Sequence, residues 1–246
     1  YEAIRVHRAG HGKATRLVPL EEARANRLVL DWRATEPPVP NRPGVTVFDD
    51  WPLDDLVSRI DWTPFFQTWE LAGHYPAILD DAVVGAQARE LWRDAQAMLE
   101  RIVAERWLTA KAVLGLFPAN AIGDDIALWE GDGARGGVRA ATIHTIRQQM
   151  EKRDGRPNLA LADFVAPLES GVADWVGAFA VTTGHGVDAR VAAYEAEHDD
   201  YSAILLKALA DRLAEAFAER LHEKVRTEYW GYAADEALDN AALIQE

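Results

Sequence analysis

The chain has 246 residues, 49% of them hydrophobic, which is enough to bury the core of one large domain or two small ones. The absence of cysteine excludes disulfides and thiolate metal sites, and it agrees with a reducing cytoplasm. The formal net charge of -14 argues against a nucleic-acid partner, because most of this surface would repel a polyphosphate. A basic or cationic partner fits this charge better.

No apolar run reaches the roughly 18 residues that a membrane span needs, and no signal peptide opens the chain. We therefore expect no membrane partner and a cytoplasmic location. The first residue is Tyr1 rather than Met, and the residues before Glu246 hold no stop signal. These ends predict a fragment of a longer protein.

Residues 1–34 are locally basic, and residues 35–44 contain four prolines. This proline density forbids a helix and favours an extended, polyproline-like chain. Residues 1–44 are predicted to be a linker or a wrapping arm that leads from an upstream module. The compact domain is predicted to span 45–246, starting near Val45.

Three helices are predicted in the first half of the domain. A short amphipathic helix covers 53–60, with Asp50 as a possible cap. A second helix has Pro64 in its first turn and Asp61 or Thr63 as its cap. The third helix covers 85–106 and has a continuous apolar face.

The periodicity then changes to that of strands, which are predicted at 111–117, 125–129, 138–146 and 174–181. The glycine-rich stretch 131–137 is interpreted as a hairpin turn rather than a phosphate loop, because it lacks GxGxxG order and a GK[ST] ending. Residues 159–167 are interpreted as a site-bearing loop. Because helices and strands do not alternate as βαβ units, the predicted class is α+β, with a largely antiparallel twisted sheet flanked by helices.

A long helix is predicted from Asp199 to about Tyr229, after a shorter helix at 188–197. Its apolar stripe recurs with helical spacing and is predicted to be core; it includes Leu205, Leu209, Leu213 and Phe217. At one margin of the helix, Asp211, Glu215 and His222 fall within about 40° of one another. This acidic margin is either a solvated edge, paired with Lys207 and Arg212, or a carboxylate wall facing a cation.

The sequence gives little support to several kinds of chemistry. It contains no HExxH, HxH or paired-carboxylate spacing, and His198-Asp199-Asp200 is more typical of a helix start than of a metal site. It also contains no GxSxG nucleophile elbow and no glycine-rich strand-to-helix turn of a Rossmann methyltransferase. We therefore predict neither a metal ligand nor a catalytic residue in this chain.

Several short segments, taken together and in order from about Leu20 to the end, resemble the S-adenosylmethionine-binding activation domain of cobalamin-dependent methionine synthase. Each segment alone is weak, and the set is specific. The segments are Ile60–Phe66 (IDWTPFF), Gly115–Asn120 with Gly123–Asp125, Leu161–Pro167, His198–Tyr201, Lys207–Glu219, Leu221–Glu223 and Tyr229–Tyr232.

The resemblance implies a role in reactivating a methyltransferase of methionine biosynthesis. In that family, cobalamin is occasionally oxidised to inactive cob(II)alamin, and the activation domain docks over the cobalamin-binding module of the same polypeptide. It presents the methyl group of S-adenosylmethionine while flavodoxin or a flavoprotein reductase supplies an electron. The zinc, folate, homocysteine and cobalamin sites of the family lie in other modules, so this fragment alone is expected to be inactive.

The resemblance also assigns residues. The aspartate of the IDWTPFF motif binds S-adenosylmethionine in the family, and this role transfers to Asp61. Such a carboxylate can pair with the ammonium group of the ligand, although a helix cap remains the rival role for Asp61. Glu215 is expected at or near the ligand, in one cleft with Asp61, and Asp211 is expected to face the cobalamin module.

The sequence departs from the family pattern at its end. The family's RPAPGYP segment, which grips the amino-acid end of the ligand, would begin just after Glu246 and is absent. We therefore expect an activation domain that is truncated at its C-terminal end and has an incomplete pocket. The alternative function is a non-catalytic interaction domain that caps a cobalamin module or a redox partner and binds no small molecule.

Overall fold

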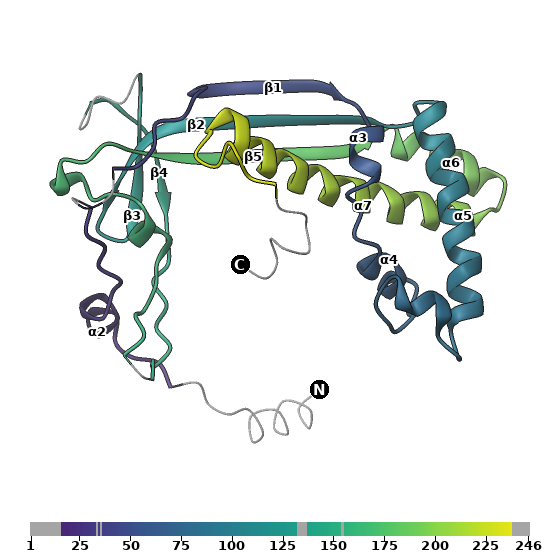
Figure 1. Ribbon diagram of the computed structural model, residues 1–246, viewed down its shortest axis with the longest axis horizontal. Coiled ribbons are helices and arrows are strands. Elements are labelled where there is room, and N and C mark those ends of the chain that lie inside the picture. The colour runs from purple at the N-terminus through teal and green to yellow at the C-terminus, as the bar shows by residue number, and fades with distance from the viewer. Residues whose placement is uncertain (1–15, 33, 35, 132–136, 154, 238–246) are drawn as a thin grey trace. The chain divides into compact units, whose positions relative to one another are not determined.

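The computed structural model in Figure 1 describes residues 16–237, apart from 33, 35, 132–136 and 154. The described chain forms two compact units. Unit 1 consists of residues 16–39 and 117–176, and unit 2 consists of residues 40–116 and 177–237. Two strands, β2 (Thr109–Ile122) and β5 (Asp174–His185), continue from one unit into the other.

The strands of the described residues form one five-stranded sheet, in which β1, β2, β3 and β4 are neighbours in that order and β5 pairs with β2. In unit 2, β1 (Gly44–Trp51) runs antiparallel to the first half of β2 and pairs Val45 with Gly115. In unit 1, the second half of β2 runs antiparallel to β3 (Asp125–Trp129), which in turn pairs with β4 (Arg139–His144). The predicted α+β class with a largely antiparallel sheet is confirmed.

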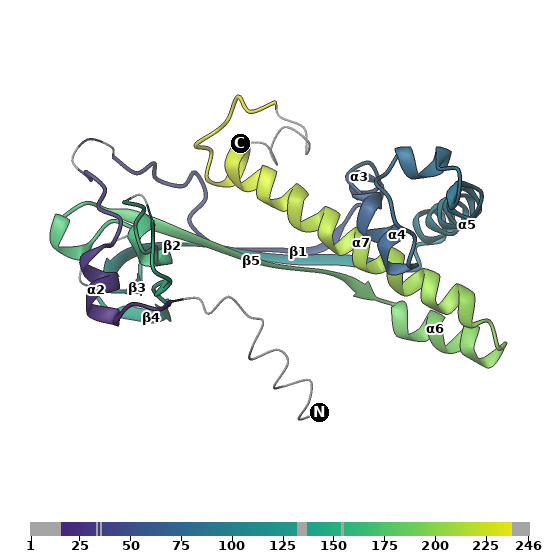
Figure 2. The ribbon, with the colours of Figure 1, turned by 90° about the horizontal axis from the view of Figure 1, so that it is seen from below.

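Unit 2 is built around its longest helix, α7 (Asp200–Lys224), which packs against the other α-helices of this unit. These are α3 (Asp54–Val57), α4 (Trp62–Thr68), α5 (Gly85–Ala104) and α6 (Val187–Ala196). Figures 1 and 2 show that the C-terminal end of α7 lies at the sheet and that the helix extends from there to the cluster of α4, α5 and α6. A turn of π-helix, Val225–Tyr229, extends it and packs against Leu114 and Leu116 of β2.

The predicted apolar stripe of α7 is confirmed as core, because Leu205, Leu209, Leu213 and Phe217 are each at most 2% exposed. Buried alanines at 203, 210 and 216 lie between these large side chains and let neighbouring elements approach the helix closely. Phe217 contacts Trp51 at the end of β1, with 5.1 Å between the ring centroids. The helix therefore joins the sheet and the helical cluster of unit 2 in a single core.

Unit 1 has a smaller apolar core, formed by Ala119, Ala121, Ile126, Ala162 and Val165. Its other elements are short: α2 (Leu20–Ala25) and the 3-10 turns η2 (Leu161–Phe164) and η3 (Leu168–Ser170). Backbone hydrogen bonds attach the α2 segment to this unit, from Val18 N to Gln149 O and from Asn158 N to Asn26 O, both at 2.8 Å. Residues 36–43, the proline-rich stretch, form neither helix nor strand.

Most predicted elements are present, with two differences. Strand β1 is not in the predicted set; its two valines, Val45 and Val47, point outward and are more than 60% exposed, so the core pattern there is weak. Helix α3 is shorter than the predicted 53–60 and has no side-chain cap. Asp50 instead forms an ion pair with Arg106. The predicted hairpin turn at 131–137 lies largely outside the described residues.

Among the described residues, no helix combines the length and the apolar character that a membrane span requires.

Replacing Leu209 by alanine should lower the free energy of unfolding by about 2–5 kcal/mol, because the cavity opens in the most buried part of α7. Urea unfolding followed by circular dichroism measures this. The control is Lys207→Ala on the exposed side of the same helix, whose ion pair with Glu195 is solvated and worth at most about 1 kcal/mol. A loss at Leu209 no larger than that at Lys207 would contradict the core assignment.

Candidate functional site

The first candidate residue, Asp61, stands at the N-terminus of α4. Its backbone is extended, and its Oδ1 atom accepts a hydrogen bond from the Thr63 backbone N–H at 2.9 Å. Pro64 fits the first turn of this helix because proline needs no backbone N–H donor there. The capping role that sequence analysis weighed for Asp61 is therefore present. Within the described part of the chain, its Oδ2 atom has no hydrogen-bond partner, and the residue is exposed.

Thr63 uses its side chain as well. Its hydroxyl oxygen accepts a hydrogen bond from the Tyr75 backbone N–H at 3.2 Å, which ties the start of α4 to the loop after it. The buried aromatic residues of this helix, Trp62, Phe65 and Phe66, anchor it in the core of unit 2. The Asp61 carboxylate is thus held on a fixed helix end, and one of its oxygens is open to solvent.

The second and third candidates, Glu215 and Asp211, lie on the exposed side of α7. Both pair with Arg212, which makes an ion pair to Glu215 and a 2.7 Å contact from its Nη2 to Asp211 Oδ2. The Arg212 side chain is only 12% exposed, whereas those of Asp211 and Glu215 are 72% and 45% exposed. The charge pairing considered for a solvated edge is therefore present for Arg212, while Lys207 pairs with Glu195 of α6 instead.

Asp61 and Glu215 belong to the same unit, and their helices pack against each other. The local electrostatics differ between them, because Asp61 has no cation as a partner among the described residues and Glu215 has Arg212. A ligand with an ammonium group would meet an available carboxylate at Asp61. At Glu215 it would share the carboxylate with an arginine.

Unit 1 contains a buried charge cluster that sequence analysis did not identify. The Arg147 side chain is 1% exposed, and its guanidinium donates two hydrogen bonds to Asp163, at 2.7 and 2.8 Å, and one to Asp124 at 2.8 Å. Asp124 also pairs with Arg24 of α2 at 2.7 Å. Asp124 and Asp163 lie in two of the segments on which the family resemblance rests. Arg147 lies in no such segment and had no local signal, because only the folded loops place it between the two aspartates.

The cluster has clear electrostatic consequences. Burial alone would raise the pKa of Asp163 and of Asp124, but their hydrogen bonds with arginine outweigh burial and lower both pKa values. The hydrogen bonds with Asp163 likewise raise the pKa of Arg147. All three groups are therefore charged at neutral pH, and their charges pair with one another within unit 1.

The side chain of Asn120 fixes the loop that contains Ala166 and Val172. Its side-chain amide donates to the carbonyl oxygens of Ala166 and Val172, both at 3.0 Å, and its Oδ1 accepts from the Trp129 indole N–H at 3.1 Å. Asp174 accepts hydrogen bonds from the backbone N–H groups of Ala166 and Trp175. The predicted site-bearing loop at 159–167 is thus fixed by buried polar contacts within unit 1.

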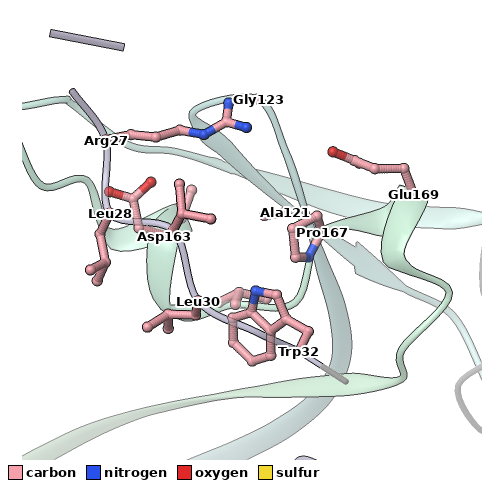
Figure 3. Close-up of a pocket in the computed structure, with 12 residues that line it drawn as sticks. Arg27, Leu28, Leu30, Trp32, Ala121, Gly123, Asp163, Pro167 and Glu169 are labelled. Atoms are coloured by element: carbon pink, nitrogen blue, oxygen red, sulfur yellow. The ribbon is translucent and has the colours of Figure 1, made fainter. Parts of the chain in front are cut away.

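A small cavity of about 100 Å³ lies beside this loop (Figure 3). The segment 27–32 forms one wall and contributes Leu30 and Trp32. Ala121, Pro167 and Glu169 line other parts of the cavity. Asp163 also lines it, but its carboxylate is already bound by Arg147 and by the backbone N–H of Ala160. The cavity is therefore small, and its buried carboxylate is already occupied.

The chain was compared with known protein families and with solved structures. Residues 52–246 match the family described as vitamin B12 dependent methionine synthase, activation domain. The chain belongs to this family. A solved structure described as the crystal structure of the MetH reactivation domain bound to AdoHcy matches with 53% sequence identity and a TM-score of 0.89. The match covers 94% of this chain and 70% of that chain.

In the described residues, no group of three or more histidines, aspartates or glutamates is arranged to hold a metal ion. The exposed carboxylates of α4 and α7 lie in unit 2, whereas the carboxylates of unit 1 that contact Arg147 are structural. The carboxylates of Asp61, Asp211 and Glu215 are therefore open to solvent, whereas those around Arg147 are largely enclosed.

Arg147→Gln should destabilise the domain by about 3–5 kcal/mol, because it leaves the buried Asp163 carboxylate without its cation and Asp124 with Arg24 alone. Guanidinium-induced unfolding measures this loss. Arg16→Gln is the matched control, since the Arg16–Glu151 pair is 79% and 47% exposed and should contribute at most about 1 kcal/mol. Equal stability of the two variants would show that the buried cluster does not hold unit 1 together.

The same cluster predicts a pH dependence. Because the pKa values of Asp124 and Asp163 are lowered in the fold, their contribution to stability is present above the ordinary aspartate value of 3.8 and is lost as the pH falls through the folded values. The stability difference between wild type and Arg147→Gln should therefore shrink as the pH is lowered from 7 toward 3. A constant difference across this range would contradict the ionised pairing.

Proposed function

We propose that this activation domain binds S-adenosylmethionine and supports the reductive remethylation of cob(II)alamin in methionine synthase. The observation that carries this proposal is the 53% identity, over 94% of the chain, to a reactivation domain whose crystal structure contains AdoHcy, the demethylated form of that ligand. The alternative function, an interaction domain that binds no small molecule, does not account for this match.

Within this proposal, Asp61 pairs with the ammonium group of the ligand through the oxygen that is not used for capping. A charged hydrogen bond of this kind contributes roughly 1.5–3 kcal/mol. Glu215 supplies a second negative charge near the ligand, attenuated by Arg212, and the packing of α4 against α7 supports one common cleft. Asp211, which is more exposed than Glu215, faces the cobalamin-binding module.

The residues of this chain bind and position the methyl donor, and its sulfonium group supplies the methyl. The cobalamin module of the same polypeptide accepts the methyl group, and flavodoxin or a flavoprotein reductase supplies the electron. The reaction takes place in the cytoplasm. The other cofactors, cobalamin and zinc, belong to other modules of the parent methyltransferase, EC 2.1.1.13. We further propose that residues 1–44 link the domain, residues 45–246, to the upstream module, and that the fragment alone does not turn over methionine.

The test is Asp61→Asn in the longer polypeptide that contains this domain. Asparagine caps helices about as well as aspartate, so the change removes the charge and keeps the cap. Calorimetry should show S-adenosylmethionine binding weakened about 10- to 100-fold, as expected for the loss of a charged hydrogen bond. Methyl transfer by enzyme that is already active should stay nearly unchanged.

The control is Asp49→Asn, which removes one exposed carboxylate from β1 of the same unit. It separates a loss of a specific contact from a general change in charge, and it should leave the affinity within about twofold of wild type. If Asp61→Asn binds as tightly as Asp49→Asn, Asp61 is only a helix cap. If wild type binds no S-adenosylmethionine, the proposed function itself is wrong.

A further inference from the structure

Unit 2 contains a hollow of about 250 Å³ that combines aromatic rings with carboxylates. We call it the Trp69 pocket. It lies where the end of α4, the first half of α5 and the start of α7 meet, and all of its residues belong to unit 2. Its lining residues are Trp69, Gln87, Glu90, Leu91, Asp94 and Tyr201.

The two rings form an open corner, since the centroids of Trp69 and Tyr201 are 5.3 Å apart and the planes are tilted by 56°. Such a corner offers ring faces to a cation, which the negative potential of the rings attracts. The hydroxyl of Tyr201 donates a hydrogen bond to Asp94 Oδ2 at 3.0 Å and fixes that carboxylate beside the rings. Burial, followed by the influence of Asp94, raises the pKa of Tyr201 to about 12, so the phenol stays a donor at neutral pH.

The spacing of the two acids suits one guanidinium group. Arg93, outside the pocket lining, contacts both acids with its Nη2 atom, at 3.1 Å from Asp94 Oδ1 and 3.6 Å from Glu90 Oε1. The Arg93 side chain is 70% exposed, so these contacts are weak and replaceable. With Arg93 counted, the two acids still leave a net negative charge at the pocket.

One residue of the pocket lining also has an unsatisfied polar atom. The indole nitrogen of Trp69 is buried and has no hydrogen-bond partner among the described residues. Buried indole N–H groups usually have a partner, so the indole of Trp69 is not fully satisfied in the domain as it stands.

We propose that the Trp69 pocket binds the guanidinium group of an arginine side chain presented by a partner protein. The planar guanidinium stacks on an aromatic face and donates hydrogen bonds to both carboxylates, whereas a lysine ammonium has no planar face to stack. The net charge of -14 on the chain favours such a basic segment at long range. This site is separate from Asp61 and Glu215 and does not depend on S-adenosylmethionine.

The test is a titration of the 246-residue chain with N-acetyl-arginine methylamide, followed by the Trp69 indole N–H signal in a ¹H–¹⁵N spectrum. Trp69→Phe identifies that signal among the nine tryptophans. We expect a saturable shift of this signal and a dissociation constant at least tenfold higher for the double variant Glu90→Gln, Asp94→Asn. Glu100→Gln, which removes an exposed acid of α5 outside the pocket, should bind as wild type does.

Arg93→Gln gives an independent check with the opposite sign. If an incoming arginine competes with Arg93 for the two carboxylates, this variant should bind the probe about two- to fivefold more tightly, a change well under one decade of affinity. The proposal is overturned if the Trp69 signal does not shift, if the double variant binds unchanged, or if Arg93→Gln weakens binding. Equal affinity for N-acetyl-lysine methylamide would overturn the assignment to arginine.

Discussion

Unit 2 depends on the burial of one face of α7. Leu205, Leu209, Leu213 and Phe217 lose nearly all contact with solvent, and each large side chain removed from water contributes about 1.5–3 kcal/mol. Small alanines between them allow several elements to pack on the same helix. Because the stripe is on one face only, the opposite face stays in solvent, and that is where Asp211 and Glu215 are presented.

Unit 1 is stabilised in a different way. Its apolar core contains three alanines beside Ile126 and Val165, which bury little area compared with leucine or phenylalanine. Its loops are held instead by buried polar groups, with Arg147 between two aspartates and Asn120 bonded to three neighbours. Buried ion pairs are costly to break and add little over an apolar core, so this arrangement favours one definite loop conformation over high stability.

The sequence predicts unit 2 far better than unit 1. The stripe of α7, the helix α5 and the cap of α4 follow from local periodicity and from capping chemistry, which a single sequence records directly. The partner of Asp163 could not be found in this way, because Arg147 is brought to it by loops with no period. Strand β1 was not predicted for a related reason, since its valines face outward and its inner face is only partly buried.

The candidate site shows the same division. That Asp61 caps a helix follows from Pro64 and from the preference of aspartate for that position, and the structure confirms it. The pairing of Arg212 with Glu215 is also expected from helical spacing, whereas Asp211 pairs with the adjacent Arg212 rather than with Lys207 one turn away. The Trp69 pocket could not be predicted, because Trp69, Asp94 and Tyr201 come from three helices and meet only when those helices pack.

The proposed sharing of the Asp61 carboxylate between the helix cap and the ligand has a thermodynamic consequence. One oxygen caps the first turn of α4, so a ligand on the other oxygen would favour the form of the domain in which that turn holds the carboxylate in place. Occupancy and the order of this helix end are then linked, and each favours the other by mass action. The start of α4 would therefore behave as a sensor whose backbone amides exchange more slowly with solvent as the site fills.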